Sequence, residues 1–308
     1  MLGRSLHHRL AIWACFSVLP LALWATDYQG SFERRFQVLG PAQLELDTAS
    51  GDTTVHSGPS GTVTVIGKIH VNNRWLTGDQ QARVRELESN PPLRQEGNTI
   101  HVAHTNLHNI SVDYVITVPA DTGIQSHSGS GDLNIQDLTG ELNLESGSGD
   151  LWLENIRGRI TTRSGSGDVH ARGISNAFSA EAASGDVWLE ERGQGDVDIR
   201  TTSGNIEVRG LEGRLGVEAS SGDISVQGRP AANWRVKAGS GNIHLSIPRD
   251  AAFQLDANTD SGELEINHAV TTTVEGNLDR LGHSLEGAVG SGGPRVSVHT
   301  GSGDIDVD

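Results

Sequence analysis

The sequence predicts an all-β protein: a single-chain β-solenoid (parallel β-helix) with coils of about 18–19 residues, preceded by an N-terminal β-rich cap with one short helix. The first supporting observation is the phrase Ser-Gly-Asp, or a close variant of it, which returns at a nearly fixed step. It closes on residues separated by 18, 18, 18, 19, 18 and 19 positions, namely Asp132, Asp150, Asp168, Asp186, Asn205, Asp223 and Asn242. A period in this range is typical of stacked structural repeats.

The second observation is that apolar residues keep the same phase in every repeat. Leu133 and Ile135 follow one such Asp, and Leu142 and Leu144 form a second pair further along the same repeat. Apolar residues at i and i+2 indicate a strand with one buried face, so each repeat is predicted to contain two strands and two turns. One repeat cannot bury its few inward residues alone, but stacking joins them into a continuous interior. Hairpins of a β-sandwich are the alternative fold, although they would not need every loop at the same phase.

Residues 1–25 have the pattern of a secretory signal peptide. Two arginines precede an apolar run that extends to Leu23, and the small residue Ala25 marks the expected cleavage site. An uncleaved N-terminal anchor is the alternative. The single cysteine, Cys15, would leave with the signal, so disulfides are not expected in the exported chain.

The chain is acidic, with 39 Asp and Glu against 23 Lys and Arg and a formal net charge of −16. Nucleic acid and anionic membrane surfaces are therefore not expected as partners, because binding to phosphate arrays needs clustered Lys and Arg. No later apolar run reaches the roughly 18–20 residues that span a bilayer, so no transmembrane segment is expected in the mature chain. These features predict an exported protein of the periplasm or the cell surface.

The remaining regions are predicted in order along the chain. Residues 26–131 form an N-terminal β-rich region whose status as a cap or a separate domain the sequence leaves open. Within it, Gly78 to Glu88 is the one good helical candidate, and two prolines end it. Residues 132–266 form the regular solenoid, and residues 267–308 form an irregular excursion followed by a C-terminal cap coil.

The recurring corner residues have a structural explanation. Glycine supplies left-handed backbone angles, and Asp, Asn and Ser side chains bond to nearby backbone groups in tight turns. We therefore interpret the Asp and Asn column as structural turns. Weak calcium binding is the alternative, because stacked carboxylates would repel one another. Asn205 and Asn242 argue against it, since an uncharged amide is a poorer ligand for a hard cation.

The outward positions of the strands give the candidate binding surface. Between the two inward residues of successive strands stand Trp152, His170 and Trp188, which would form an exposed aromatic strip. Such a strip could stack on the rings of a glycan or contact a protein partner. A stabilising ladder or simple scatter is the alternative interpretation.

No catalytic or cofactor site is predicted. His101, His104 and His108 lie close together, but the Glu of a zinc-protease motif is missing and the flanks have the pattern of strand and loop. The Ser-Gly-Ser-Gly copies fall in coil corners and need no nucleophile. A β-helix enzyme that acts on polysaccharides is the alternative function, although no unique cluster of acids stands out.

Three copies of Ser-Gly-Ser-Gly-Asp, at residues 128–132, 146–150 and 164–168, are each followed by an apolar-X-apolar segment. Together with the lead-in at residues 114–121, they resemble the bacterial putative-adhesin family of β-strand-repeat proteins, a domain of unknown function. The resemblance covers roughly residues 40–308. It implies an exported β-solenoid of the cell envelope and transfers no catalytic residues. The predicted function is thus a non-enzymatic adhesin or scaffold that binds an envelope glycan or protein; a calcium-stabilised rod is a further alternative.

Overall fold

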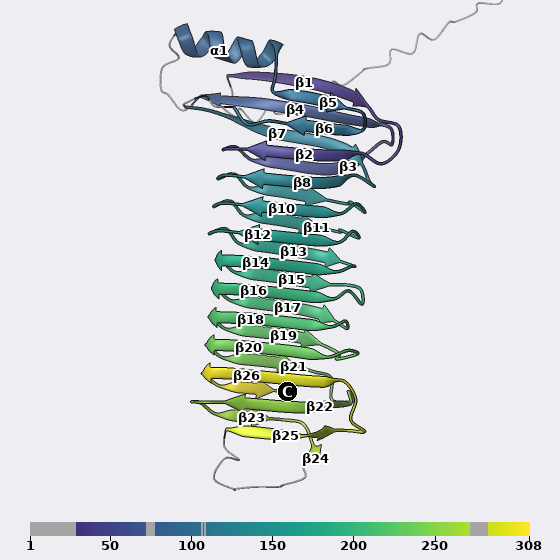
Figure 1. Cartoon of the computed structure of the whole chain (residues 1–308), viewed down its shortest axis with the longest axis vertical. Coiled ribbons are helices and arrows are strands. Elements are labelled where there is room, and N and C mark those ends of the chain that lie inside the picture. The colour runs from purple at the N-terminus through teal and green to yellow at the C-terminus, as the bar shows by residue number, and fades with distance from the viewer. Residues whose placement is uncertain (1–28, 72–77, 106, 108, 272–282) are drawn as a thin grey trace, which may run out of the picture.

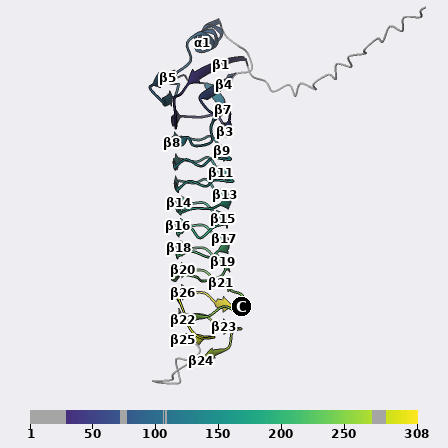
Figure 2. The same ribbon diagram turned by 90° about the vertical axis from the view of Figure 1, so that its right-hand side faces the viewer.

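The computed structural model describes residues 29–71, 78–105, 107, 109–271 and 283–308. Two long β-sheets lie face to face and form a flattened rod, as Figures 1 and 2 show. Sheet A has 13 strands and sheet B has 14. The predicted solenoid of two-stranded coils is therefore confirmed. The predicted signal peptide lies outside the described residues.

Each regular coil contributes one strand to each sheet. In sheet A these strands are β9 (Leu133–Gln136), β11 (Leu151–Glu154), β13 (Val169–Ile174), β15 (Val187–Glu191), β17 (Ile206–Leu211), β19 (Ile224–Gly228) and β21 (Ile243–Ser246). In sheet B they are β8 (Gly123–Ser128), β10 (Leu142–Ser146), β12 (Ile160–Ser164), β14 (Phe178–Ser184), β16 (Val197–Ser203), β18 (Leu215–Ser221) and β20 (Trp234–Ser240).

All these neighbours pair in parallel, and their register repeats the sequence period. Leu142 pairs with Ile160, and Ile160 with Phe178, so the predicted apolar columns lie in line along the rod. Their side chains are almost fully buried between the sheets. The extra residue of the 19-residue coils falls in the loops at 192–196 and 229–233, between the two strands of a coil.

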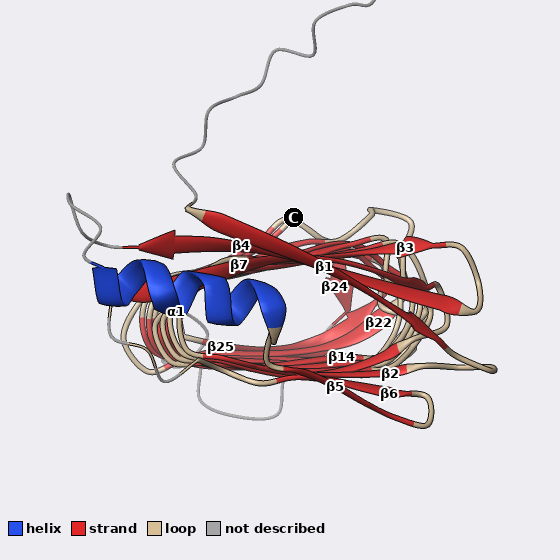
Figure 3. Ribbon diagram, turned by 90° about the horizontal axis from the view of Figure 1, so that it is seen from above, coloured by secondary structure: helices blue, strands red, loops and turns tan. Residues whose placement is uncertain are grey.

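The first strands and the helix of the N-terminal region cap the rod. Strands β1 (Gly30–Gln37), β4 (Thr62–Val71) and β7 (Ile110–Pro119) pair antiparallel at the end of sheet A, and the hairpin of β5 (Leu93–Glu96) and β6 (Thr99–Val102) ends sheet B. Helix α1 (Gly78–Ser89) crosses this end and buries Val84 and Leu87 (Figure 3). The first solenoid coil, β2 (Gln43–Thr48) and β3 (Thr53–Gly58), already lies below this cap and pairs with β8 and β9.

The C-terminal coil differs from its expected position at the end of the rod. Strands β26 (Arg295–Ser302) and β27 (Ile305–Val307) insert between β20 and β21 on one side and β22 (Phe253–Thr259) and β23 (Leu264–Ile266) on the other (Figure 1). The antiparallel strands β25 (Ser284–Val289) and β24 (Val270–Thr271) extend sheet B beyond β22. After β21 the chain thus forms β22 and β23 one level further along the rod and leaves a level open. It then returns, and β26 and β27 fill that level, so both strands are paired on both sides.

Candidate functional site

The corner glycines are required by the close approach of successive coils. A Cβ atom on Gly149 would lie 2.0 Å from the carbonyl oxygen of Gly131, far inside van der Waals contact. A Cβ atom on Gly167 would likewise lie 2.1 Å from the carbonyl oxygen of Gly149. We expected left-handed backbone angles to explain this column, but such angles occur at only some members, among them Gly222 (φ 136°). Close approach is therefore the shared cause.

The corner aspartates link one coil to the next. The Oδ1 atom of Asp132 accepts a hydrogen bond from the backbone N–H of Asp150 at 2.9 Å, and Asp150 accepts one from Asp168 at 2.8 Å. The ladder continues through Asp186, Asn205, Asp223, Asn242, Asp304 and Glu263. We expected these bonds within each corner, yet only the serines make them there; Ser146, for example, contacts Gly149. Asn replaces Asp because its amide oxygen is an equivalent acceptor.

The corner column does not assemble a metal site in the part of the chain that the structure describes. No group of three or more His, Cys, Asp or Glu side chains converges there in a geometry that could hold an ion. One carboxylate oxygen of each corner Asp is already engaged by the next backbone N–H. Weak calcium binding, the alternative interpretation of this column, stays a prediction.

The structure places the three candidate binding residues side by side, but only Trp152 is exposed as predicted, whereas His170 and Trp188 are half-buried. Trp152 on β11 pairs with His170 on β13, which pairs with Trp188 on β15, so all three project from the outer face of sheet A. The rings of Trp152 and His170 stack with centroids 4.0 Å apart and planes 17° from parallel. Trp152 is 45% exposed, an unusual state for so large an apolar side chain.

These three side chains line a groove of about 630 Å³, which we call the aromatic groove; we refer to the rings as its floor and to the polar lining residues as its rim. Its rim carries polar groups from the neighbouring strand positions and from the corners: Asn134, Gln136, Glu154, Asp168, Arg172, Asp186, Asn205 and Glu207. An apolar floor with a rim of donors and acceptors is the usual composition of a small-ligand site. The corner residues Asp168 and Asp186 therefore also border the candidate site.

Three histidines lie close together in the sequence, and two of them are described by the structure. His101 lies 2.8 Å from Glu45, whereas His104 lies 2.9 Å from Asp47, so each imidazole has its own carboxylate partner. His101 faces Glu45 from β6 to β2 of the first coil, and His104 lies just beyond the end of β6. His108 lies outside the described residues.

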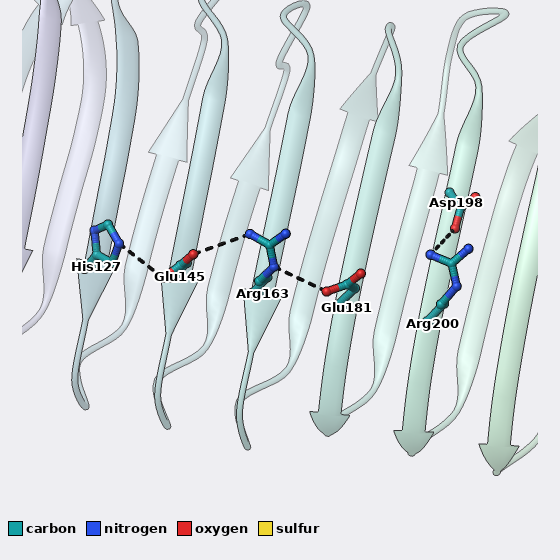
Figure 4. A network of polar contacts seen from close by, with 6 residues as sticks. All are labelled: His127, Glu145, Arg163, Glu181, Asp198 and Arg200. Atoms are coloured by element: carbon teal, nitrogen blue, oxygen red, sulfur yellow. Dashed lines mark hydrogen bonds and ion pairs between the residues drawn. The ribbon is translucent and has the colours of Figure 1, made fainter.

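Sheet B carries a charge ladder that the sequence analysis missed. The outward column alternates between acidic and basic residues at each coil and reads Asp47, His127, Glu145, Arg163, Glu181, Arg200, Glu218 and Lys237. Figure 4 shows its centre, where Arg163 lies 3.4 Å from Glu145 and 3.3 Å from Glu181. The column becomes visible when the residue three positions after the first inward residue of each second strand is aligned, such as Glu145 after Leu142.

A buried carboxyl was also missed. Glu191 is 2% exposed and occupies an inward column whose neighbouring members, Ile174 and Leu211, are aliphatic. Burial raises the pKa of Glu191 to about 7, against the opposing effect of hydrogen bonds from the backbone N–H groups of Gly193 and Arg192. The sequence signal was a single Glu where neighbouring repeats carry Ile or Leu.

The fold and the repeated corners together define a β-strand-repeat solenoid. The chain belongs to the Toastrack DUF4097 family, whose model matches residues 43–308. This confirms the domain-of-unknown-function family that the corner repeats suggested.

Two crystal structures are similar over most of the chain. One is of a putative adhesin from Bacteroides fragilis NCTC 9343, with 15% sequence identity, 91% of this chain and 98% of the other covered, and a TM-score of 0.39. The other is of a putative cell adhesion protein from Clostridium sporogenes ATCC 15579, with 10% identity, coverage of 90% and 98%, and a TM-score of 0.24. At these scores the likenesses carry no argument about ligands. A search of curated proteins found no match.

The one helix in the described part of the chain, α1, is too short and too polar to cross a membrane, and the described residues contain no other candidate span.

Proposed function

We propose that this protein is a non-enzymatic, exported binding or scaffold protein of the cell envelope, and that the aromatic groove on sheet A binds a glycan. The observation that carries the proposal is the half-exposed Trp152, stacked on His170 in a groove with a polar rim. An exposed ring of this size has a cost in water that a ligand with an apolar face would relieve.

A glycan fits this composition better than a purely apolar ligand. Sugar rings present C–H faces that stack on aromatic floors, while their hydroxyl groups need donors and acceptors at the rim. The aromatic groove offers both, because Asn134 and Gln136 stand at one end and Asp186 and Asn205 at the other. The parallel coils hold these groups at the fixed strand spacing of about 4.8 Å, which suits a rigid, pre-formed site.

Binding can be tested with two neutral probes, cellotetraose and chitotetraose, by tryptophan fluorescence and calorimetric titration. We expect the double variant Trp152→Ala/Trp188→Ala to weaken binding at least about tenfold, since buried aromatic anchors dominate such contacts. Trp152→Phe/Trp188→Phe keeps an aromatic floor and should retain most of the affinity.

Arg163→Ala on sheet B is the matched control, because it changes an exposed strand residue far from the aromatic groove. The proposal fails if neither probe, nor any member of a glycan array, binds the folded protein. It also fails if the double tryptophan variant binds as well as the wild type while its melting temperature is unchanged.

A further inference from the structure

A second groove lies on the opposite face of the rod, on the outer side of sheet B, where the C-terminal half of the chain forms the sheet. It has a volume of about 640 Å³ and is lined by outward residues of β16, β18, β20 and β26, by Asp256 of β22, and by Arg214 and Asn233 in the loops that precede β18 and β20. We call it the cationic groove. The aromatic groove, in contrast, lies on β11, β13 and β15 of sheet A, so the two sites share no residue.

A glycine in the outward column produces the hollow. Gly216 on β18 stands in register between Asp198 on β16 and Arg235 on β20, where a side chain would otherwise fill the surface. Nothing in the backbone demands glycine there. A Cβ atom on Gly216 would lie 3.2 Å from the Oδ2 atom of Asp198 and 3.7 Å from the Nη1 atom of Arg214, and its nearest neighbours include no backbone atom. The first distance is tight, but it involves the end of a flexible side chain that can shift, so the main effect of the glycine is to leave space.

The charge of the cationic groove opposes that of the whole chain. The protein has a formal net charge of −16. Five cationic side chains nevertheless line this groove against three anionic ones: Arg200, Arg214, Arg235, Lys237 and Arg295 against Asp198, Glu218 and Asp256. Since the surrounding acidic surface repels anions, this local excess of positive charge is the feature that could attract one.

Two of these cations are not neutralised by partners. Arg200 lies 3.0 Å from Asp198, and Arg295 lies 2.6 Å from Asp256. Arg235 and Lys237, by contrast, have no carboxylate within 4.0 Å among residues 29–71, 78–105, 107, 109–271 and 283–308. Both are exposed.

The placement of this free pair suits an oxyanion. Arg235 and Lys237 are two residues apart on β20, so both side chains project from the same face of the sheet. A guanidinium presents a planar fork of donors that matches carboxylate or phosphate oxygens, and the neighbouring ammonium adds a point charge. The hollow over Gly216 lies directly beside Arg235 and provides room for the group that carries the oxyanion.

We propose that the cationic groove binds a ligand that carries a carboxylate or a phosphate group, with Arg235 and Lys237 as its anchors and the space over Gly216 as its seat. An acidic sugar and a sugar phosphate present the same oxyanion chemistry and fit a groove of this volume. The proposal is independent of glycan binding at the aromatic groove.

The test uses three monosaccharide probes: glucuronate, glucose 6-phosphate and neutral glucose, titrated into the full exported chain by calorimetry or NMR. We expect at least one charged probe to bind and glucose not to bind. Arg235→Ala/Lys237→Ala should weaken that binding at least about tenfold. High salt should also weaken it, because exposed charges are screened.

Two further variants separate the groove from general electrostatics. Arg94→Ala/Arg163→Ala removes the same amount of charge from exposed positions outside the groove and should leave binding within about twofold. Gly216→Val keeps every charge but fills the hollow, and should weaken binding as the anchor variant does. Trp152→Ala/Trp188→Ala should have no effect, which distinguishes this site from the aromatic groove.

Binding of glucuronate alone would indicate acidic sugars as the ligand class, and binding of glucose 6-phosphate alone would indicate phosphate esters; either supports the proposal. It is overturned if neither charged probe binds at millimolar concentration. It is also overturned if the control Arg94→Ala/Arg163→Ala reduces affinity as much as Arg235→Ala/Lys237→Ala, or if Gly216→Val has no effect while the variant remains folded.

Discussion

At the coil corners the same small set of residues recurs at every level, whereas the outward positions of the adjoining strands change from coil to coil. Gly149 and Gly167 each stand against the carbonyl of the preceding corner glycine, and Asp150 and Asp168 each accept a hydrogen bond from the next coil. These contacts allow few other residue types at the corners. The outward positions have water on one side, so they tolerate the Trp, His, Glu, Ser and Gly that occupy them.

In a repeat protein, this contrast indicates where functional residues lie. Residues that recur in every coil satisfy a need that every coil has, which is to turn and to stack. Residues that depart from the repeat act at one position along the rod: Trp152 and Trp188 line the aromatic groove, and Gly216 leaves space in the cationic groove.

The largest effect is expected at a corner glycine. Gly149→Ala would place a Cβ atom 2.0 Å from the Gly131 carbonyl oxygen, and the two coils would have to separate. We expect the free energy of unfolding to fall by at least about 3 kcal/mol, the upper end of overpacking costs. Gly216→Ala, on an outward strand position, should change it by less than about 1 kcal/mol. Denaturant unfolding of both variants measures the contrast, and equal losses would contradict it.

The next effect concerns the buried Glu191, whose pKa is raised to about 7 from 4.5. Because the folded state holds this proton more tightly than the unfolded state, its contribution to stability is complete below about pH 4.5 and is lost as the pH rises through about 7. The loss is at most roughly 3 kcal/mol, at 1.36 kcal/mol for each pKa unit.

Glu191→Leu should therefore remove this pH dependence and raise the melting temperature most at neutral and alkaline pH. The exposed Glu154→Gln is the control and should follow the wild-type profile. A Glu191→Leu variant whose stability varies with pH as the wild type's does would show that this carboxyl does not titrate in the core.

A smaller effect is expected at the corner hydrogen bonds. Asp150→Ala removes the acceptor for the backbone N–H of Asp168 and should lower stability by about 1–2 kcal/mol. Asp150→Asn keeps the oxygen, as Asn205 and Asn242 do naturally, and should cost less than about 0.5 kcal/mol. If Asp150→Asn lowered stability as much as Asp150→Ala, the charge of the carboxylate and not its acceptor oxygen would matter. That result would favour the alternative of calcium binding.

The smallest effect is expected on the charge ladder of sheet B. Arg163→Ala removes two exposed ion pairs, with Glu145 and Glu181, and should lower stability by less than about 1 kcal/mol. The difference from wild type should shrink further at high salt. A loss of several kcal/mol would mean that this outward column supports the fold as the corners do.

Much of the fold could be predicted from the sequence, because in a stacked repeat the spacing between equivalent residues determines the register of neighbouring strands. The columns that begin at Leu133 and Leu142 aligned as the period predicted, and helix α1 ends one residue beyond its predicted bound. The level of the last coil could not be predicted. Residues 295–307 carry the same apolar phase as their neighbours, and a shared phase fixes which face a residue takes but not which coils it lies between.

The candidate sites followed only in part. The outward column that holds Trp152, His170 and Trp188 could be aligned from the period, since parallel strands in register place equivalent residues side by side. The cationic groove could not be aligned in this way, because it depends on side chains from five strands and on the absence of a side chain at Gly216. Which arginines already have a carboxylate partner is a matter of side-chain geometry that spacing does not encode.

We infer that the corner residues stabilise the fold and that outward residues bind the ligand. The most direct measurement is the affinity for the better of cellotetraose and chitotetraose, determined together with the melting temperature, in Trp152→Ala/Trp188→Ala and in Asp150→Ala. We predict that the tryptophan variant loses affinity and keeps its melting temperature, whereas the corner variant melts earlier and binds like the wild type. The reverse outcome, with binding lost at the corner and kept without the tryptophans, would contradict the claim.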